Sequence, residues 1–261
     1  MVTLLKLGGS LITDKTRRET LRPDVLKRIA TEIQSARKKS PEMQLIIGHG
    51  SGSFGHFEAN EHDTIHGVNT PEQWIGFAKV AQVAAALNFH VASALNDAGL
   101  PVLRMQPSAS AIASAGIIRE MSIQPILRAV EHGIVPLVYG DVAFDDEIGG
   151  TIVSTETVFS YLVSKLPIRR VLLMGEVDGV YDESGAVIPS IIRENFADIQ
   201  STLGGSGGVD VTGGMLTKVQ DMLTLANNPP YPDVYILNGK TENLITKALS
   251  GETVIGTKIS R

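Results

Sequence analysis

The residues best suited to chemistry are a lysine inside an apolar run and the glycines that follow it. Lys6 lies in the apolar segment 2–7, and Gly8, Gly9 and Ser10 come directly after it. Because an unpaired buried ammonium group is costly, Lys6 is expected to face an anion. Glycine lets backbone amides approach an oxyanion closely, as in phosphate-binding loops. This segment is therefore predicted to bind phosphate.

Two further glycine clusters have a similar setting. The segment 50–55 follows an apolar run, and Gly213-Gly214 precedes a helical pattern. Lys15 follows the first cluster closely and Lys218 follows the last. Tight turns are the commonest use of glycine, so any one cluster alone has that alternative. Together, the clusters and lysines favour a site that neutralises a transferring phosphoryl group.

The glycines of the second cluster also fit a dinucleotide signature. Gly50, Gly52 and Gly55 have the spacing GxGxxG after a strand-like run. That signature requires a short crossover helix and then a strand ending in an acidic residue about 20 residues later. Here the next strand-like run lies at 101–104, behind a long helical stretch, so a nicotinamide site is disfavoured. The P-loop pattern GxxxxGK[ST] is absent.

Four histidines fall close together, and they allow two interpretations. His49, His56, His62 and His66 could hold a metal, although only the last two have helical spacing, in a stretch without a helical pattern. His56 closes the glycine segment 50–55, so its ring is expected beside the anion held there, as a hydrogen-bond donor. A helix-capping or solvent-facing role for His56 is the alternative.

Aspartates follow several strand-like runs. Asp141, Asp178 and Asp210 each stand at such a strand end, where aspartate most often caps a turn. The other role is to orient lysines or magnesium-bound water. We favour this role only for Asp141, which is expected near the lysines at the same sheet edge.

Strand-like and helix-like runs alternate along the chain, which predicts a mainly parallel sheet with helices on both faces. Strands are predicted at 2–7, 44–48, 101–104, 134–139, 170–174 and 233–237. Helices are predicted at 23–39, 71–98, 123–132, 155–165, 215–227 and 241–249. The segment 141–152 is predicted to form a hairpin flap, and 204–208 a loop.

Composition restricts the class of protein. The 261 residues are 43% hydrophobic and 20% charged, contain no cysteine and carry a net charge of −5. Disulfides, cysteine nucleophiles and thiolate zinc sites are excluded, and no global charge favours nucleic acid or an anionic membrane. No apolar run reaches the roughly 18–20 residues of a membrane span, and no secretory leader is evident. A cytoplasmic enzyme is expected.

Together these residues resemble the amino-acid kinase superfamily over nearly the whole chain. The matching motifs are Lys6-Leu7-Gly8-Gly9-Ser10, the loop after the second strand, Tyr139-Gly140-Asp141, Val177-Asp178-Gly179-Val180-Tyr181, and Asp210-Val211-Thr212-Gly213-Gly214-Met215 with Lys218. The resemblance implies an α/β fold, an open αβα sandwich with a mainly parallel central sheet and a β-hairpin flap. It further implies one domain, with an acceptor lobe at 1–166 and a nucleotide lobe at 167–261. Dimers are common in this superfamily, so a homodimer is compatible with the sequence.

The second glycine loop is similar to that of one branch, the isopentenyl phosphate kinases. The loop reads His49-Gly50-Ser51-Gly52-Ser53-Phe54-Gly55-His56, and the segments Met105-Gln106-Pro107-Ser108-Ala109 and Tyr139-Gly140-Asp141-Val142 are also similar. This implies transfer of phosphate from ATP to isopentenyl phosphate, in isoprenoid biosynthesis by an alternative mevalonate pathway. A fosfomycin-kinase branch shares the histidine and is the first alternative. A nucleotide-sensing domain without transfer is the second.

The resemblance assigns roles by position. The residues implied to contact ATP are Lys6, Gly8, Gly9, Ser10, Gly52, Glu176, Asp178, Gly214 and Lys218. Those implied or expected to hold the acceptor phosphate are Gly50, Ser51, Gly55, His56 and Thr155. Lys6, Lys15 and Lys218 would stabilise the transferring group. Phe77 and Ala81 are candidates for a pocket around the isopentenyl tail, with core packing as the alternative.

The implied chemistry is in-line transfer to a small-molecule phosphate. Such an acceptor is already a nucleophile near neutral pH, so no strong general base is needed. Mg²⁺ would bridge the β- and γ-phosphates, and no side chain is assigned as a metal ligand.

Two positions depart from the family pattern. Ser154-Thr155-Glu156 stands where Ser-Gly-Asp is common, and Gly175-Glu176-Val177-Asp178-Gly179 stands where Thr-Asp-Val-Asp-Gly is common. Both acids keep their charge, so the chemistry is expected to survive. These two departures leave undecided how the acceptor fits its site and which nucleotide is preferred.

Overall fold

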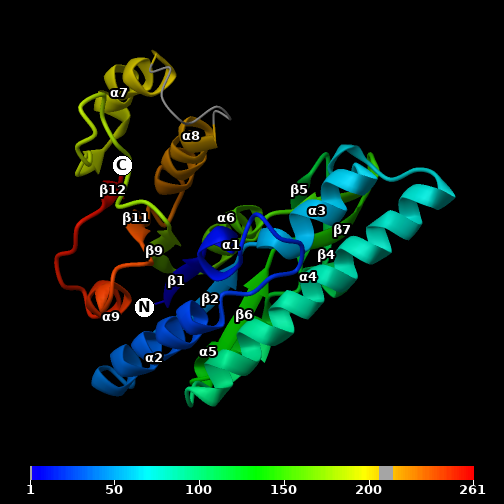
Figure 1. Cartoon of the computed structure of the whole chain (residues 1–261), viewed down its shortest axis with the longest axis horizontal. Coiled ribbons are helices and arrows are strands. Elements are labelled where there is room, and N and C mark those ends of the chain that lie inside the picture. Colours follow the sequence, from blue (N-terminus) through cyan, green and yellow to red (C-terminus); the bar gives the residue numbers. More distant parts are fainter. Residues whose placement is uncertain (1, 206–213) are drawn as a thin grey trace.

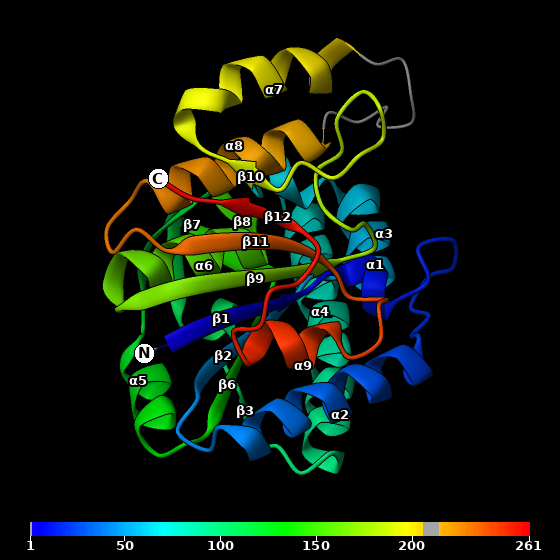
Figure 2. The same cartoon turned by 90° about the vertical axis from the view of Figure 1, so that its left-hand side faces the viewer.

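An eight-stranded sheet runs through the molecule in the order β10-β12-β11-β9-β1-β2-β6-β3 (Figures 1 and 2). The computed structural model describes residues 2–205 and 214–261. The strands of this sheet are β1 (Val2–Leu7), β2 (Gln44–His49), β3 (Val102–Arg104), β6 (Val135–Tyr139), β9 (Ile168–Gly175), β10 (Ser190–Ile191), β11 (Asp233–Asn238) and β12 (Thr257–Ile259). Among them only β11 and β12 pair antiparallel, so the predicted mainly parallel sheet is confirmed.

Alternate residues of the central strands face two separate cores. Leu4 and Ile46 belong to the core beneath α5 (Gln124–Glu131), α6 (Thr155–Lys165) and α8 (Gly214–Ala226). Leu5 and Ile47 belong to the core beneath α1 (Gly9–Ile12), α2 (Pro23–Lys39), α4 (Pro71–Asp97) and α9 (Leu244–Leu249). Since successive side chains of a strand point to opposite faces, helices cover both faces, as the sequence predicts.

The register of the parallel strands brings their carboxyl ends to one edge. Leu7 lies opposite His49 of β2 and Met174 of β9, and Asn238 of β11 lies opposite Gly175. The loops after these four strands therefore meet at the same edge, which is where ligands bind in open α/β sheets.

A second sheet of four strands, in the order β5-β4-β7-β8, lies beside the first. Its strands are β4 (Ala111–Ser114), β5 (Ile117–Met121), β7 (Asp141–Asp145) and β8 (Gly149–Val153). The predicted hairpin is present as β7 and β8, and Asp145 fixes its turn by accepting backbone hydrogen bonds from Glu147 and Ile148. The sequence did not predict β4 and β5, so the flap is larger than expected.

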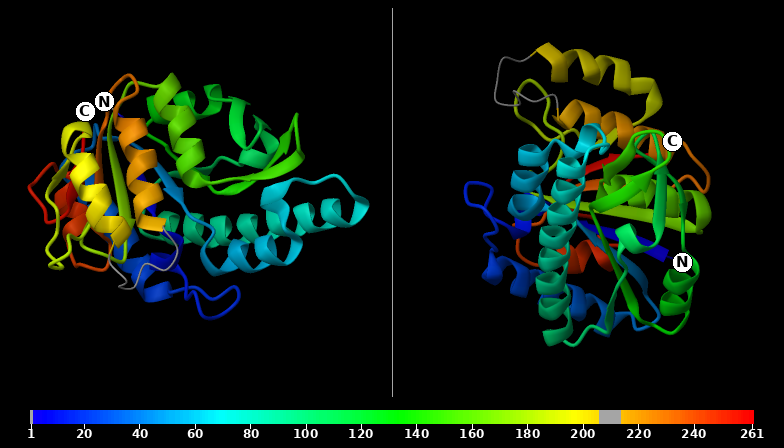
Figure 3. Two further views of the ribbon diagram at one scale, coloured as in Figure 1. Left: turned by 90° about the horizontal axis from the view of Figure 1, so that it is seen from above. Right: turned by 90° about the vertical axis from the view of Figure 1, so that its right-hand side faces the viewer.

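The second glycine cluster runs directly into α3 (Gly52–His62), which the sequence did not predict. The helix ends at Asp63, whose φ of 50° is left-handed, and a short turn η1 (Thr64–His66) follows. His62 and His66 therefore lie on different elements, and the helical spacing of a metal pair does not exist. Figure 3 shows α3 and one end of α4 projecting beyond the central sheet beside the small sheet.

The helix α4 is long and apolar enough, by composition alone, to cross a membrane. A face of it is buried in the molecule, where Leu87, Val91 and Leu95 join the core beneath α2 and α9. This packing is that of a core helix. A capping box between Thr70 and Gln73 fixes its start.

Near the C-terminus, α7 (Arg193–Gly205) is a further helix that the sequence did not predict. It contains the first part of the predicted loop 204–208, and the rest of that loop lies outside the described residues. Asp210 and Gly213 also lie outside them.

Candidate active site

The first two glycine loops touch each other through their backbones. A Cβ atom on Gly9 would lie 2.4 Å from the amide nitrogen of Gly52, and one on Gly50 would lie 3.0 Å from the nitrogen of Gly9. Gly8 donates its amide to the carbonyl of Met174 at 2.8 Å, which ties the first loop to β9. Two anions bound by these loops would consequently lie side by side.

Thr13 joins the two loops, and nothing in the sequence marks it beyond its nearness to the first glycines. Its hydroxyl donates to the carbonyl of Gly9 at 2.7 Å and accepts the amide of Ser53 at 3.0 Å. The residue is fully buried. Gly52 has a φ of +50°, and a Cβ there would lie 2.2 Å from the Thr13 hydroxyl. Only glycine fits at this junction.

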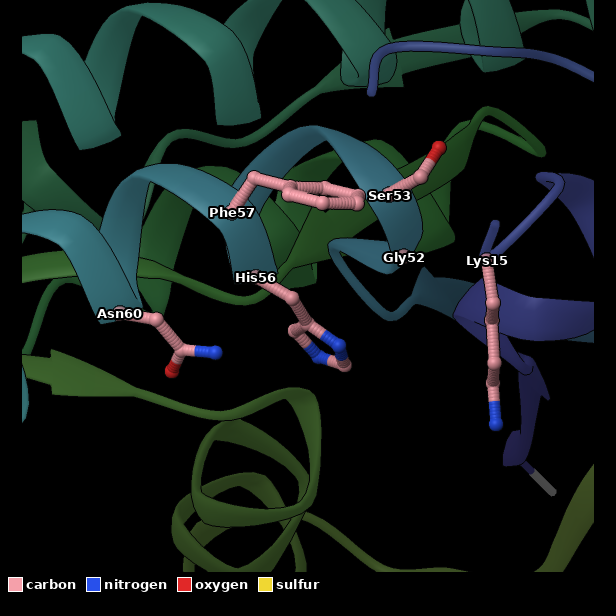
Figure 4. Close-up of a pocket in the computed structure, with 6 residues that line it drawn as sticks. All are labelled: Lys15, Gly52, Ser53, His56, Phe57 and Asn60. Carbon is pink, nitrogen blue, oxygen red and sulfur yellow. The ribbon is translucent and has the colours of Figure 1, made fainter. Parts of the chain in front are cut away.

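An open pocket of about 210 Å³ lies beside the loops. Its lining residues are Lys15, Gly52, Ser53, His56, Phe57 and Asn60. In Figure 4 the side chains of His56 and Lys15 extend on the same side of α3, whereas Ser53 points to the other side. Two predicted site residues thus face one space, from α3 and from the loop after α1.

His56 lies in the second turn of α3, so it does not cap the helix, and it is exposed, in agreement with the solvent-facing part of the alternative. Although the ring is exposed, the surrounding protein withdraws part of its hydration. This loss of hydration, followed by the positive charges of Lys15 and Lys6, lowers the pKa of His56 below 6.5. A bound anion would oppose these effects and favour the protonated, doubly donating ring.

Lys6 forms a close ion pair with Glu156, at the start of α6. The side chain of Lys6 is 13% exposed and that of Glu156 is 24% exposed. Burial raises the pKa of Glu156, but the charge and hydrogen bond of Lys6, with the charge of Lys218, lower it overall. Glu156 therefore brings together two of the predicted lysines, one from each end of the chain.

Asp141 was expected to orient the lysines, but the partner of Lys6 is Glu156. Its carboxylate is buried and accepts the amides of Ser108 and Val142 at 3.0 and 2.9 Å. Burial raises its pKa, and hydrogen bonds from Ser108, Val142 and Tyr139 oppose this rise. Asp141 thus fixes the turn η2 (Pro107–Ala109) to β7, and Glu156 holds the place expected for it.

His49 is a core residue rather than a metal ligand. Its Nε2 accepts the side-chain amide of Asn88 at 3.0 Å, so Nδ1 carries the proton and donates to the carbonyl of Gly50 at 3.1 Å. The imidazole ring stacks on the ring of Tyr139, with 5.6 Å between the ring centroids. Burial lowers its pKa to about 4. The described residues contain no group of three or more His, Cys, Asp or Glu able to hold a metal.

Thr155 replaces the glycine that the family pattern leads us to expect, and its side chain is buried. The hydroxyl donates to the carbonyl of His49 at 2.6 Å. Its methyl group fills the space beside Gly48, where a Cβ would lie 2.6 Å away. The side chain of Thr155 is therefore occupied by contacts at the sheet edge. The backbone amide at the start of α6 is still available to bind an anion.

The acids after β9 form a separate network. Glu176 accepts Arg22 at 2.9 Å and pairs with Lys240 at 2.7 Å. Asp178 accepts the side-chain amide of Asn238 at 2.8 Å. Both lie at the carboxyl edge, on the β9–β11 side of the first glycine loop. The extra methylene of Glu176 is compatible with reaching both cations.

The remaining predicted residues divide between the edge and the core. Ser10 lies in α1, Ser51 packs against Gly55 at the start of α3, and Gly214 begins α8 with an exposed backbone. Phe77 and Ala81 belong instead to an apolar cluster between α4 and the small sheet. Phe77 contacts Trp74 and Gly150 there, and neither candidate lines the pocket beside His56.

Comparison with known proteins gives a consistent result. Residues 1–238 match the amino acid kinase family. The chain is 37% identical to the isopentenyl phosphate kinase of Methanothermobacter thermautotrophicus, over 98% of each protein. It is 32% identical to that of Methanocaldococcus jannaschii, over 99% of this chain and 98% of the other. An X-ray structure of isopentenyl phosphate kinase, 34% identical, superposes with a TM-score of 0.84 and covers 99% of this chain and 100% of that one.

Proposed function

The chain belongs to the amino acid kinase family and, within it, to the isopentenyl phosphate kinases, and we propose that it converts isopentenyl phosphate to isopentenyl diphosphate. The γ-phosphoryl group of ATP passes to a phosphate oxygen of the acceptor. The bond from the γ-phosphorus to the β–γ bridging oxygen breaks, and ADP leaves. The acceptor loses a proton only where it enters as the monoanion.

The contact between Gly9 and Gly52 is the observation that carries this proposal. Donor and acceptor phosphates repel each other, so a kinase for a phosphorylated acceptor needs two adjacent anion sites. Two glycine loops whose backbones touch provide such sites. Cations border them on both sides, with Lys6 and Lys218 near Glu156, and Lys15 facing the pocket.

Each part of the edge has a task in the transfer. The amides after β1 bind the nucleotide phosphates, and those of residues 50–55 bind the acceptor phosphate, with His56 as a further donor. Lys6, Lys15 and Lys218 offset charge on the transferring group, and Glu156 orients Lys6. The effect is positioning and electrostatic stabilisation, with no covalent intermediate on the protein.

Several finer assignments are part of the proposal. Mg²⁺ would supply charge neutralisation between the β- and γ-phosphates, and sites of this kind use substrate phosphates with few protein ligands. That fits an edge rich in amides and lysines. Residues 1–166 form the acceptor lobe and 167–261 the nucleotide lobe. We also propose that this enzyme is located in the cytoplasm.

The direct test is a comparison of acceptors with ATP and Mg²⁺. Purified protein is given isopentenyl phosphate, dimethylallyl phosphate or fosfomycin, and ADP release is measured together with the phosphorylated product by phosphorus NMR. We expect the highest kcat/KM with isopentenyl phosphate or its isomer. A preference for fosfomycin would assign the chain to the antibiotic-kinase branch instead.

The same assay addresses a binding protein without catalysis. Steady ADP release that depends on the acceptor rules out a nucleotide sensor. Binding of ATP, seen by calorimetry, without turnover of any acceptor would support the sensor and refute the kinase. Lys6→Ala, which removes the buried cation, is the matched inactive control.

A further inference from the structure

The loop that carries Lys15 is closed on itself. Asp14 donates its amide to the carbonyl of Thr20 at 2.8 Å, and an antiparallel bridge joins Thr13 to Leu21 just outside. The carboxylate of Asp14 accepts the amide of Thr16 at 2.9 Å. Residues 14–20 therefore form a compact, closed loop.

Arg18, at the far side of this loop, is clamped to α3. Its Nη1 donates to Glu58 at 2.8 Å, and its Nη2 donates to Glu61 at 2.7 Å. The two carboxylates lie one helical turn apart, so the planar guanidinium bridges them. The group also lies 5.7 Å from the ring centroid of Phe57, which lines the pocket. Arg18 thus binds three residues of the helix that carries His56.

The backbone next to Arg18 is held at the start of the same helix. Glu19 donates its amide to the carbonyl of Ser53 at 3.1 Å, and Thr20 donates to the Ser53 hydroxyl at 3.2 Å. Glu19 has a φ of 49°, a left-handed conformation that is unfavourable unless its surroundings hold it. Every one of these contacts joins the loop to α3.

Lys15 itself has no such anchor. It is exposed, and within residues 2–205 and 214–261 it makes no ion pair. The place of its ammonium group beside His56 consequently depends on how the loop is held. Loss of Arg18 would also remove the ion pair of the buried Glu58 carboxylate, which has the His62 ring as another neighbour at 3.6 Å.

We propose that Arg18 is a positioning residue that locks the loop 14–20 onto α3 and so sets Lys15 opposite His56 across the acceptor pocket. The inference rests on the proposed function for its catalytic consequence, but not for its geometry. Arg18 touches no reacting atom in this scheme. It acts through Lys15, and its removal matters only while Lys15 is present.

A double-mutant cycle tests this dependence. In Arg18→Ala, kcat should fall roughly tenfold to a hundredfold, because small displacements of a reacting group have effects of that size. KM for ATP should change little. In a Lys15→Ala background the same substitution should have no further effect on kcat. Losses that multiply in the double variant would overturn the proposal, because independent sites are additive in free energy.

Arg17→Ala is the matched control. Arg17 is the neighbouring exposed cation of the same loop, and its side chain makes no ion pair or hydrogen bond to the described part of the chain. It should retain wild-type kcat, and a loss equal to that of Arg18→Ala would show that loop charge alone matters. Arg18→Lys should recover only part of the rate, because one ammonium group cannot bridge both carboxylates as a fork does.

A second readout does not require the proposed substrate. The pKa of His56, followed by NMR without ligand, should rise in Lys15→Ala, because a neighbouring positive charge is removed. It should rise in Arg18→Ala as well, but not further when Lys15→Ala is already present. A further rise in the double variant would mean that Arg18 acts directly, and the positioning role would fail even if the chain proved to be a kinase.

Glu61→Gln keeps the test informative if Arg18→Ala does not fold. Glu61 is the exposed partner of the clamp, so its loss should leave the fold intact. We expect a smaller fall in kcat, again absent in the Lys15→Ala background. If Glu61→Gln lowered kcat as much in the Lys15→Ala background as in the wild-type protein, the proposal would be contradicted.

Discussion

Lys6 and Glu156 form an ion pair at the carboxyl edge of the sheet although 150 positions separate them in the chain. Lys6 lies near the end of β1, and its side chain is largely buried. Glu156 lies in the first turn of α6, which follows the small sheet. The pair fixes the ammonium group of Lys6 one residue before the end of β1, where the first glycine loop follows. Its carboxylate is also near Lys218, from the last third of the chain.

Replacing Glu156 should therefore impair catalysis through Lys6. In Glu156→Gln the neutral amide no longer orients the ammonium group, and kcat should fall roughly tenfold to a hundredfold. Glu156→Asp, which keeps the charge, should retain more of the rate. Glu131→Gln, which breaks an exposed pair with Arg128, is the control and should behave as wild type. Wild-type kcat in Glu156→Gln would remove this role from the pair.

The contact between Gly9 and Gly52 leads to a steric prediction. In Gly9→Ala the new methyl group would lie 2.4 Å from the amide nitrogen of Gly52, so the loops must separate. We expect kcat to fall by about a hundredfold, and the free energy of unfolding to fall by roughly 1–3 kcal/mol. Activity assays and chemical denaturation measure the two effects.

Gly175→Ala is the matched control for the stability measurement. Gly175 ends β9 at the same edge, and a Cβ there would meet no atom within 4 Å. Its unfolding midpoint should equal that of wild type. If Gly9→Ala were as stable and as active as wild type, the close approach of the loops would not be needed for turnover.

The sequence predicted well the strands of the central sheet and the helices that cover it. The helices at Pro23–Lys39 and Thr155–Lys165 have the predicted bounds, because each shows apolar residues at helical spacing. It failed for α3, in which Phe54 is the one large apolar residue among the buried residues Gly52, Ser53, Phe54, Gly55 and Glu58. Such a helix has no apolar stripe to detect, and its position is set by packing against α4 and the first glycine loop.

The candidate site was predictable where local sequence carries the chemistry. Lys6, the glycine loops and His56 are recognisable because their types and spacing suit phosphate. Thr13 and Glu156 were not assigned, since a threonine bridging two loops and a carboxylate paired across the fold depend on tertiary contacts. Asp141 was expected to orient the lysines only because it shares their sheet edge, and in the structure Glu156 is the residue that pairs with Lys6.

His56 should be the most sensitive side chain of the acceptor pocket. In His56→Ala, turnover of isopentenyl phosphate should fall roughly 10²- to 10³-fold, the loss typical of one donor to a developing oxyanion. His66→Ala is the control, because that side chain, on η1, is 77% exposed and pairs with Asp63 at the end of α3. Unchanged steady-state kinetics in His56→Ala would refute the assigned contact with phosphate.

The protonation of His56 gives a test without turnover. Loss of hydration and the charges of Lys15 and Lys6 hold its pKa below 6.5 in the free protein. A phosphate anion stabilises the imidazolium, so inorganic phosphate should raise this pKa and binding should take up protons. NMR titration of the ring with and without phosphate measures the shift. If the pKa of His56 did not change when phosphate is added, the anion would have to bind elsewhere.

His49 makes the fold itself sensitive to acid. Burial holds its pKa at about 4, whereas in the unfolded chain it returns to 6.5. As the pH falls below 6.5, the unfolded state binds a proton that the folded state refuses until about pH 4, so protonation favours unfolding. The stability is complete above pH 6.5 and is lost towards pH 4. At about 1.4 kcal/mol per pKa unit, His49 alone contributes a loss of roughly 3 kcal/mol.

Denaturant unfolding at a series of pH values between 7 and 4 isolates this effect. His49→Gln should be less stable than wild type at pH 7, because the bonds to Asn88 and Gly50 and the stacking on Tyr139 are altered. Its free energy of unfolding should then depend less on pH, because the titrating group is gone. His132→Gln, at an exposed position after α5, controls for the loss of an imidazole. Equal pH slopes in His49→Gln and wild type would show that the buried ring does not govern acid stability.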